Sequence, residues 1–241
     1  KIFFGHLNDM RKIRDIKNPT ILEIGPGDGI STAIYASELN SPKVYLIDVD
    51  DYADKDIKKY IKIIEAIDKK DIKDISKINS IAEILKRFNA HYLTNGIESL
   101  KTIKDESIDY LFSHSVLEHI KLSEFESFIK EIHRIMKPKG LISHNINFKD
   151  HLGESLNNYR FSEKIWESNL FANSGFYTNR IPARKMHNSF KEVGFNLLWE
   201  NFSAWPNLPI DRKLIHKDFD HFSDNDLINC TSAFIAEKKI N

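Results

Sequence analysis

A glycine-rich loop near the start of the chain has the residues of a nucleotide-type ligand site. Glu23, Gly25, Gly27 and Gly29 lie at the end of one short apolar run, and Asp48 ends the next. Glycine lets a backbone approach a ligand where a Cβ would clash. An acidic residue about twenty positions after such a loop can bind both hydroxyls of a ribose. The pattern therefore predicts a site for a nucleoside-containing cofactor.

The spacing of the glycines distinguishes between cofactors. A dinucleotide fingerprint reads G-x-G-x-x-G, and counting from Gly25 places Ile30 where the third glycine would be. That glycine allows the helix to pack closely on its strand. Ile30 therefore counts against a nicotinamide cofactor, and the observed pattern is E-x-G-x-G-x-G instead.

This pattern resembles motif I of the class I S-adenosylmethionine-dependent methyltransferases, with Asp48 matching the acid after their second strand. The resemblance implies that the glycine loop passes under the methionine part of S-adenosylmethionine and that Asp48 holds its ribose. It also places Asn95 and Gly96 near the adenine. The predicted cofactor-binding residues are Glu23, Gly25, Gly27, Gly29, Asp48, Asn95, Gly96, Ser113 and His114.

Histidines and acids cluster after the fourth and fifth apolar runs, namely His114, Glu118, His119, His144, Asp150 and His151. Histidine titrates near neutral pH and can take a proton from an attacking hydroxyl. His151 is the expected catalytic base, with His144 as the second candidate and Asp150 orienting the base. Each histidine could equally hold a turn or lie in the core. A divalent metal held by Asp150, His151 and His144 stays possible but is not favoured, since the spacing matches no strong metal motif.

Later segments extend the resemblance over nearly the whole chain. Residues 107–120 and 136–140 look like the fourth- and fifth-strand motifs of these methyltransferases, with Asn147 where Asp is expected. Ser113 to Val116 contains no proline, unlike the motif of enzymes that methylate base nitrogens. Residues 156–162, 166–168 and 174–180 are similar to a bacterial subgroup associated with surface-polysaccharide assembly, either capsule or O-antigen.

An aromatic and amide-rich set follows from that subgroup resemblance. Aromatic rings can stack on sugar C–H surfaces, and Asn and Arg can bind hydroxyl or phosphate oxygens. The alternative is that these rings pack a lid and the Asn residues cap turns. The predicted acceptor-binding residues are His119, Asn158, Tyr159, Arg160, Trp166, Tyr177, Asn179 and Arg180.

Apolar runs that alternate with helical patterns predict an α/β fold. We expect a Rossmann-like, doubly wound seven-stranded sheet, mostly parallel with an antiparallel last strand, in a single domain over 1–241. Residues 52–89 predict an insertion of two or three amphipathic helices after the second strand. Residues 147–182 predict an irregular lid on the acceptor side. Strands are expected near 20–24, 43–48, 90–94, 108–113, 140–146, 195–200 and 229–236, and helices over 30–39, 123–136 and 183–193.

The composition limits the remaining possibilities. Formal charge is zero, so a nucleic-acid partner is disfavoured, because such binding depends on phosphate neutralisation. No apolar run approaches the roughly 20 residues that span a bilayer. The single cysteine, Cys230, suits a reducing compartment and a cytoplasmic protein. The first residue is Lys1 rather than Met, so the start of this sequence supports no inference about targeting.

Together these features predict methyl transfer from S-adenosylmethionine to an oxygen of a sugar, a nucleotide-sugar or a phosphorylated glycan precursor. A catalytically silent cofactor-binding or scaffolding subunit is the alternative outside enzymes. A nicotinamide-dependent oxidoreductase is the less favoured alternative within them. The identity of the acceptor, the choice between oxygen and nitrogen, and the oligomeric state are left open by the sequence.

Overall fold

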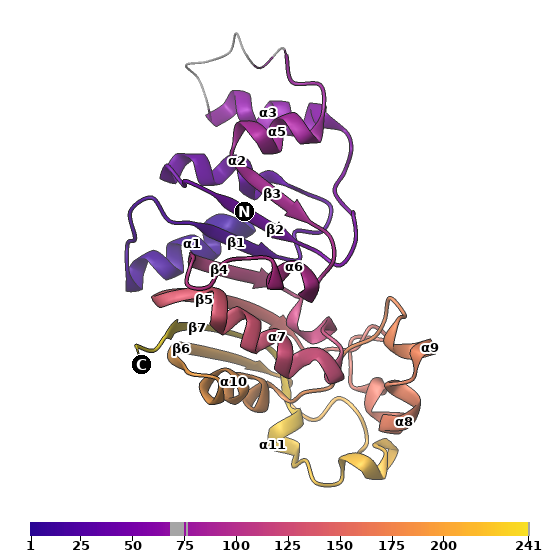
Figure 1. The fold of residues 1–241 in the computed structure, drawn as a ribbon. Coiled ribbons are helices and arrows are strands. Elements are labelled where there is room, and N and C mark those ends of the chain that lie inside the picture. The colour runs from indigo at the N-terminus through magenta and orange to yellow at the C-terminus, as the bar shows by residue number, and fades with distance from the viewer. Residues whose placement is uncertain (68–74, 76, 241) are drawn as a thin grey trace. The chain divides into compact units, whose positions relative to one another are not determined.

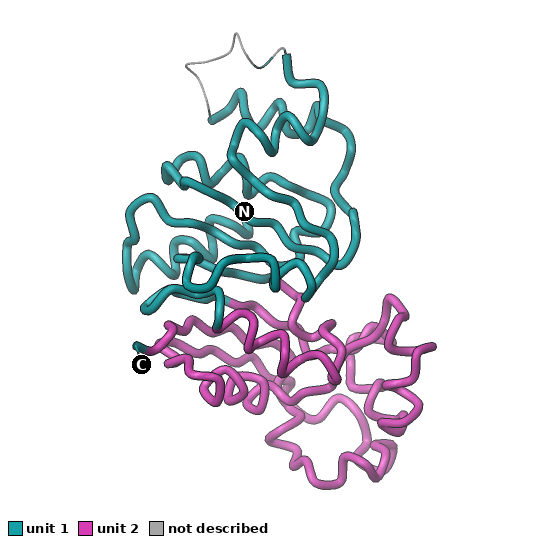
Figure 2. The backbone as a smooth tube through the Cα atoms, viewed as in Figure 1, with its two compact units in different colours: residues 1–113, 134–143, 240 teal, residues 114–133, 144–239, 241 magenta. Residues whose placement is uncertain are grey.

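The computed structural model describes residues 1–67, 75 and 77–240. These residues form two compact units, which Figure 2 distinguishes by colour. Unit 1 comprises residues 1–113, 134–143 and 240, and unit 2 comprises 114–133 and 144–239. Among the described residues, no helix combines the length and apolar character needed to cross a membrane.

Seven strands of the described chain form one sheet in the order β3-β2-β1-β4-β5-β7-β6. β1 pairs in parallel with both β2 and β4, β2 pairs in parallel with β3, and β6 pairs antiparallel with β7 (Figure 1). The strands are β1 (Ile21–Ile24), β2 (Val44–Ile47), β3 (Ala90–Leu93), β4 (Ile108–His114), β5 (Met136–Asn147), β6 (Phe195–Ala204) and β7 (Asn229–Lys238). The predicted fold class is thereby confirmed.

An N-terminal helix, α1 (Ile2–Ile13), was not predicted from the sequence. Its buried residues Phe3, His6, Leu7 and Met10 recur at helical spacing, which is the signal that could have revealed it. The His6 Nδ1 atom lies 2.7 Å from Ser143 Oγ, and the Phe3 ring packs 6.0 Å from that of Phe112. α1 therefore packs against β4 and β5 within unit 1.

The predicted insertion after β2 contains two described helices, α3 (Ile57–Ile67) and α5 (Ile81–Arg87). Tyr60, Ile64 and Ile84 are its buried residues on these helices. α5 begins at Ser80, whose hydroxyl accepts a hydrogen bond from the Glu83 N–H at 3.2 Å. Ile72, one of the apolar positions that predict a helix here, lies outside the described residues.

Three further helices lie where the pattern predicted them. They are α2 (Ser31–Tyr35), which continues as the 3-10 turn η1 (Ala36–Leu39), then α7 (Leu122–Ile135) and α10 (Ala183–Glu192). The expected start of β5 near residue 140 was late. β5 begins at Met136, directly after α7, and Pro138 lies within its first residues. The strand runs on through Lys139, whose φ is +62°, so Pro138 does not delay its start.

The predicted lid over 147–182 contains more regular structure than expected. Its short helices are η3 (Asn157–Arg160), α8 (Glu163–Trp166) and α9 (Asn169–Ala172). Leu156 and Tyr159 form a small core with Ile215, Phe219 and Leu227. The partners come from the segment between β6 and β7, which contains η4 (Arg212–Leu214), η5 (Lys217–Phe219) and α11 (Asp224–Leu227).

Candidate functional site

The loop after β1 is held in a conformation that favours glycine. Gly25 and Gly27 have φ values of +69° and +62°, in the left-handed region that other residues enter at a cost. The Gly25 N–H donates to the carbonyl of Ile47 at 2.8 Å. The Gly27 N–H donates to Asp48 Oδ2 at 3.0 Å. The loop after β1 is thus fastened to the end of β2.

Asp48 is the point at which three loops of unit 1 meet. Its Oδ1 accepts from the Val49 N–H at 2.8 Å, and its backbone carbonyl accepts from the Gly96 N–H at 2.8 Å. Gly96 (φ +51°) begins the short helix α6 (Ile97–Lys101) just after β3. The side chain of Asp48 is 9% exposed, and its burial raises the pKa of the carboxyl group.

The residues of this cradle fit the cofactor that the sequence predicts. A Cβ added at Gly27 would meet nothing within 4 Å, so the space above the loop is open. Each Asp48 oxygen holds one backbone hydrogen bond and keeps a further lone pair for a ribose hydroxyl. Glu23 Oε2 is buried without a hydrogen-bond partner among the described residues. Burial raises the pKa of Glu23 to about 7, although a hydrogen bond from the Thr32 side chain lowers this pKa in part.

An exposed apolar residue of the cradle was missed by the sequence analysis. Val49 is 65% exposed, and its Cγ1 lies 3.3 Å from the position of a Cβ built on Gly96. Its position directly after the strand-ending Asp48 is the signal that could have identified it. Asn95, also exposed, accepts the first helical hydrogen bond of α6 through its carbonyl, from Glu98.

The two remaining predicted cofactor residues lie at the end of β4 in different units. Ser113, in unit 1, is fully buried and pairs in register with Ile24 at the end of β1. His114 belongs to unit 2, where the Asn145 Nδ2 atom lies 3.2 Å from His114 Nδ1. His114 is exposed, and the buried part of its ring lowers its pKa.

Unit 2 brings two of the predicted histidines together. The Nε2 atoms of His119 and His151 are 3.5 Å apart, and their ring planes differ by 7°. His119 Nδ1 lies 2.8 Å from the carbonyl of Tyr177, so this nitrogen must carry the proton and donate it. His119 Nε2 is then an acceptor. It follows that His151 donates from Nε2 and that its lone pair is on Nδ1.

The turn that carries His119 is fixed by residues predicted to bind the acceptor. The Asn179 Nδ2 group donates to the carbonyls of Leu117 and Ile120 at 2.7 and 3.0 Å. The Asn179 backbone N–H donates to the carbonyl of Glu118 at 2.7 Å. The segment near Asn179 therefore holds the 3-10 turn η2 (Leu117–His119) in place.

Two of the predicted catalytic residues have structural positions instead. His144 is fully buried between the rings of Phe190 and Phe234, with centroids 5.3 and 5.1 Å away. The Asp150 carboxylate accepts hydrogen bonds from the backbone N–H groups of Leu152, Ser155, Asn157 and Asn158. The expectation that Asp150 orients His151 is therefore replaced by a role in folding the loop after β5, and His144 is a core residue.

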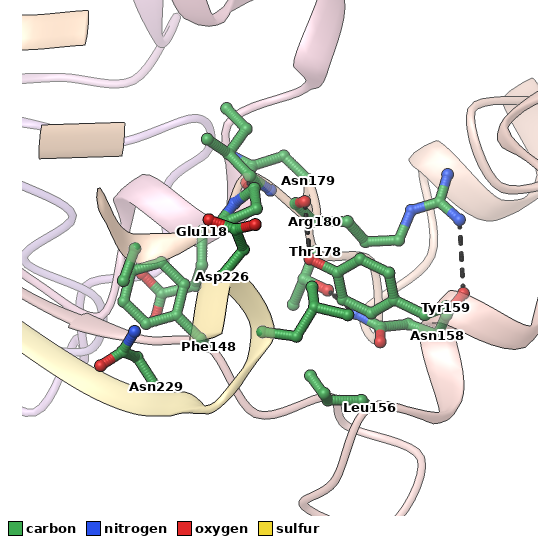
Figure 3. Close-up of a pocket in the computed structure, with 14 residues that line it drawn as sticks. Glu118, Phe148, Leu156, Asn158, Tyr159, Thr178, Asn179, Arg180, Asp226 and Asn229 are labelled. Atoms are coloured by element: carbon green, nitrogen blue, oxygen red, sulfur yellow. Dashed lines mark hydrogen bonds between the residues drawn. The ribbon is translucent and has the colours of Figure 1, made fainter. Parts of the chain in front are cut away.

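Most of the predicted acceptor-binding set forms a buried network, part of which is drawn in Figure 3. Asn158 Nδ2 donates to Thr178 Oγ1 at 2.8 Å, and the Tyr159 hydroxyl donates to the Arg180 carbonyl at 2.7 Å. The Trp166 Nε1 group donates to the carbonyl of Thr178 at 2.7 Å. These hydrogen bonds connect side chains of residues 158–166 to the backbone and side chains of residues 178–180.

Tyr177 and Arg180 complete this network through Glu167. The Tyr177 hydroxyl donates to Glu167 Oε2 at 2.7 Å, and Arg180 lies 3.3 Å from Glu167 Oε1. Burial raises the pKa of Tyr177 and lowers that of Arg180. Arg160, by contrast, is exposed and lines an open hollow with Asn157.

Glu118 is a buried acid that the sequence placed near the histidines but gave no role. It is 3% exposed, and Oε1 accepts from the Asn147 N–H at 3.1 Å. Oε2 has no hydrogen-bond partner among the described residues, and neither has Asn158 Oδ1, which lines the same small cavity (Figure 3). Burial raises the pKa of Glu118 to about 8, despite hydrogen bonds from its own N–H and that of Asn147. The described residues contain no cluster of three or more His, Cys, Asp or Glu side chains that could hold a metal.

Comparison with known proteins places this geometry in a family. A family model described as a methyltransferase domain matches residues 22–143, about half of the chain. This range contains both the glycine loop and Asp48. A search of curated protein sequences found no significant match.

Solved structures share the fold at low sequence identity. A Listeria monocytogenes protein assigned as an S-adenosylmethionine-dependent methyltransferase is 17% identical, with a TM-score of 0.54 and 99% of each chain covered. An S-adenosylmethionine-dependent methyltransferase from Methanosarcina mazei is 16% identical, with a TM-score of 0.55, covering 96% of this chain and 98% of that one.

A third similar structure contains a reaction product of the cofactor. It is the 1,6-didemethyltoxoflavin-N1-methyltransferase of Burkholderia thailandensis, solved with 1,6-didemethyltoxoflavin and S-adenosylhomocysteine. It is 12% identical, with a TM-score of 0.53, covering 99% of this chain and 76% of that one. The chain therefore belongs to the methyltransferase-domain family and has the fold of S-adenosylmethionine-dependent methyltransferases.

Proposed function

We propose that this protein transfers the methyl group of S-adenosylmethionine to an oxygen of a sugar, a nucleotide-sugar or a phosphorylated glycan precursor. The assignment of the cofactor rests mainly on one hydrogen bond. The Gly27 N–H donates to Asp48 Oδ2, which joins the glycine loop to the predicted ribose-binding acid. The acceptor part is supported by the sequence resemblance of residues 156–180 to the surface-polysaccharide subgroup.

Several residues of unit 1 would hold the cofactor. Gly25, Gly27 and Gly29 would leave room for its methionine part, and Asp48 would accept hydrogen bonds from its ribose hydroxyls. Val49, exposed beside Gly96, would provide an apolar contact for the adenine, with Asn95 at the same edge. Buried Glu23 would receive a hydrogen bond at its unpartnered Oε2.

His151 would remove the acceptor's proton. When bound, S-adenosylmethionine would supply a methyl group activated on a sulfonium; its carbon–sulfur bond would break as the acceptor oxygen bonds to the methyl carbon, and the neutral thioether S-adenosylhomocysteine would leave. The protein therefore needs mainly alignment and a base. His151 Nδ1 would take the proton of the acceptor hydroxyl. The hydrogen bond with His119 Nε2 would hold His151 in the tautomer that leaves Nδ1 free.

We also propose that residues 1–241 act as a single methyltransferase domain in which 147–182 forms the acceptor side. The free Cys230 agrees with a reducing compartment such as the cytoplasm. The amide and ring network of 158–180 would act by holding the turn of His119 instead of contacting the acceptor.

The proposal is tested by methyl transfer to defined acceptors. The chain is incubated with S-adenosylmethionine carrying a tritiated methyl group and with separate pools of free sugars, sugar phosphates and nucleotide-sugars. We expect tritium in one of these pools and less of it with H151A, while H221A, at another exposed histidine, transfers normally. Transfer to none of the pools by a chain that binds the cofactor would contradict the acceptor class.

A further inference from the structure

An open hollow of unit 2 has the chemistry of a sugar-binding site. Its volume is about 340 Å3, within the range of small-molecule sites. It is lined from the ends of β4 and β5, from the loop after β5, and from β6 and β7. The lining residues are His114, Ser115, Asn145, Ile146, Asn147, Lys149, Asn201, Thr231, Ser232 and Ala233.

The side chains of this hollow combine donors and acceptors in the manner that a polyol needs. Each of the three asparagines has two amide donors and a carbonyl acceptor, and the hydroxyl of Thr231 can do both. Within the described part of the chain, the side chains of Asn201 and Thr231 make no hydrogen bond, and Asn147 uses only Oδ1, which accepts from the Lys149 N–H at 3.2 Å. These groups are solvated and available to sugar hydroxyls.

Hydrogen bonds between the ends of β4 and β5 fix the side chains at one end of the hollow. The Asn145 side-chain amide donates to His114 Nδ1 at 3.2 Å, which fixes these two side chains relative to each other. The Ser115 N–H donates to the carbonyl of Asn145 at 2.8 Å, which joins the ends of β4 and β5.

The charge of the lining favours an anionic group on the ligand. Lys149 is its cation, and none of the lining residues that the structure describes is acidic. Lys149 Nζ lies 3.4 Å from Glu154 Oε2, whose side chain is 82% exposed. Such an exposed pair contributes little to stability, so a ligand phosphate can take the place of Glu154.

We propose that this hollow binds the methyl acceptor and that the acceptor is a phosphorylated sugar, with its hydroxyls on Asn145, Asn201 and Thr231 and its phosphate on Lys149. The inference rests on the proposed function and replaces the buried residues of 158–180 as the acceptor-binding surface. The loop from Asn147 through Lys149 continues directly to His151, which connects the hollow to the proposed base along the chain.

The test is a titration of the full-length, isotopically labelled chain with glucose 1-phosphate, glucose and inorganic phosphate, followed by NMR of the asparagine side-chain amides. We expect glucose 1-phosphate to shift the amides of Asn145 and Asn201 saturably. The N145A/N201A variant should lose at least about tenfold in affinity, since each neutral hydrogen bond contributes about 1 kcal/mol. K149A should lose about two- to fivefold for glucose 1-phosphate and nothing for glucose.

N196A is the matched control, because Asn196 is also exposed on β6 but does not line the hollow. Equal binding by N196A and N145A/N201A would overturn the inference. So would shifts by inorganic phosphate as strong as those by glucose 1-phosphate, or no shift with any probe. S-adenosylhomocysteine titrated into the same samples tests the proposed function separately, because its site lies in residues that none of these variants alters.

Discussion

The Nε2 atoms of His119 and His151 are 3.5 Å apart, and the carbonyl of Tyr177 lies behind His119 Nδ1. This arrangement leaves one proton on each imidazole and one free nitrogen, Nδ1 of His151. Burial and the adjacent His151 both lower the pKa of His119, opposed by its hydrogen bond to Tyr177. The lowered pKa keeps His119 neutral, so its Nε2 can accept a hydrogen bond from His151 Nε2.

The pair predicts a specific pattern of mutant kinetics. H151A should lower kcat about 10²- to 10⁴-fold, the usual contribution of a general base, with unchanged S-adenosylhomocysteine binding. H119A should lower kcat less and change its pH profile, because the tautomer of His151 is then no longer fixed. The double variant should be no slower than H151A, since His119 acts through His151. Additive losses in kcat would show that the two histidines act independently.

Asp48 should control cofactor affinity. D48A should weaken S-adenosylhomocysteine binding about 10- to 100-fold, because hydrogen bonds to a charged group contribute about 1.5–3 kcal/mol each. D50A is the matched control, two residues away and exposed. Calorimetry of both variants measures the effect, with circular dichroism to confirm folding. Equal affinity of D48A and D50A would contradict the assignment of the ribose to Asp48.

Gly27 and Gly175 should respond differently to alanine. In G27A the methyl group enters the open space above the loop and the backbone keeps a φ near +62°, which costs about 1–2 kcal/mol of stability. Binding of S-adenosylhomocysteine should fall further than this loss of stability explains. G175A is the control, since a Cβ there would also meet nothing within 4 Å but Gly175 lies outside the cofactor loop. Urea unfolding measures the stability of both variants and calorimetry measures their binding. A G27A protein that binds as tightly as G175A would contradict the assignment of the loop to the cofactor.

Glu118 should make stability depend on pH. Its folded pKa is about 8, above the ordinary value of 4.5, so the folded state holds a proton that the unfolded state has lost between these values. The contribution of Glu118 to stability is then fully present below about pH 4.5 and is lost as pH rises towards 8. E118Q should therefore lose less stability than the wild type between pH 5 and pH 8.

Urea unfolding at pH 5, 6.5 and 8 measures this difference. E124Q is the control, because Glu124 is exposed on α7, and it should follow the wild type. Buried Glu23, with a pKa of about 7, contributes in the same direction in both proteins and cancels in the comparison. An E118Q protein with the wild-type pH dependence would show that Glu118 is ionised in the folded state.

The sequence predicted the sheet and the proximity of the glycine loop to Asp48 because both depend on local signals. Each strand is a short apolar run, and Gly25, Gly27 and Asp48 follow their strands directly along the chain. The boundaries differ only where a local signal was weak. At Pro138, between the expected end of a helix at 136 and the expected strand near 140, β5 has already begun.

The roles of His144 and of residues 147–182 could not be predicted, because their burial depends on distant segments. Tyr159 is buried by Phe219, and His144 by Phe190 and Phe234. An asparagine or a tyrosine has the same sequence signal whether it faces a ligand or a backbone carbonyl. The hollow lined by the ends of β4 and β5 and by the β6–β7 pair was missed for the same reason, since Asn201 lies more than fifty positions from Asn145 and Asn147 along the chain.

The central claim is that the cradle around Gly27 and Asp48 binds S-adenosylmethionine. Isothermal titration calorimetry of the purified chain with S-adenosylhomocysteine tests it most directly, with NAD as the control titrant. The account predicts micromolar binding of S-adenosylhomocysteine and no heat from NAD. A folded chain that binds NAD, or that does not bind S-adenosylhomocysteine, would contradict it.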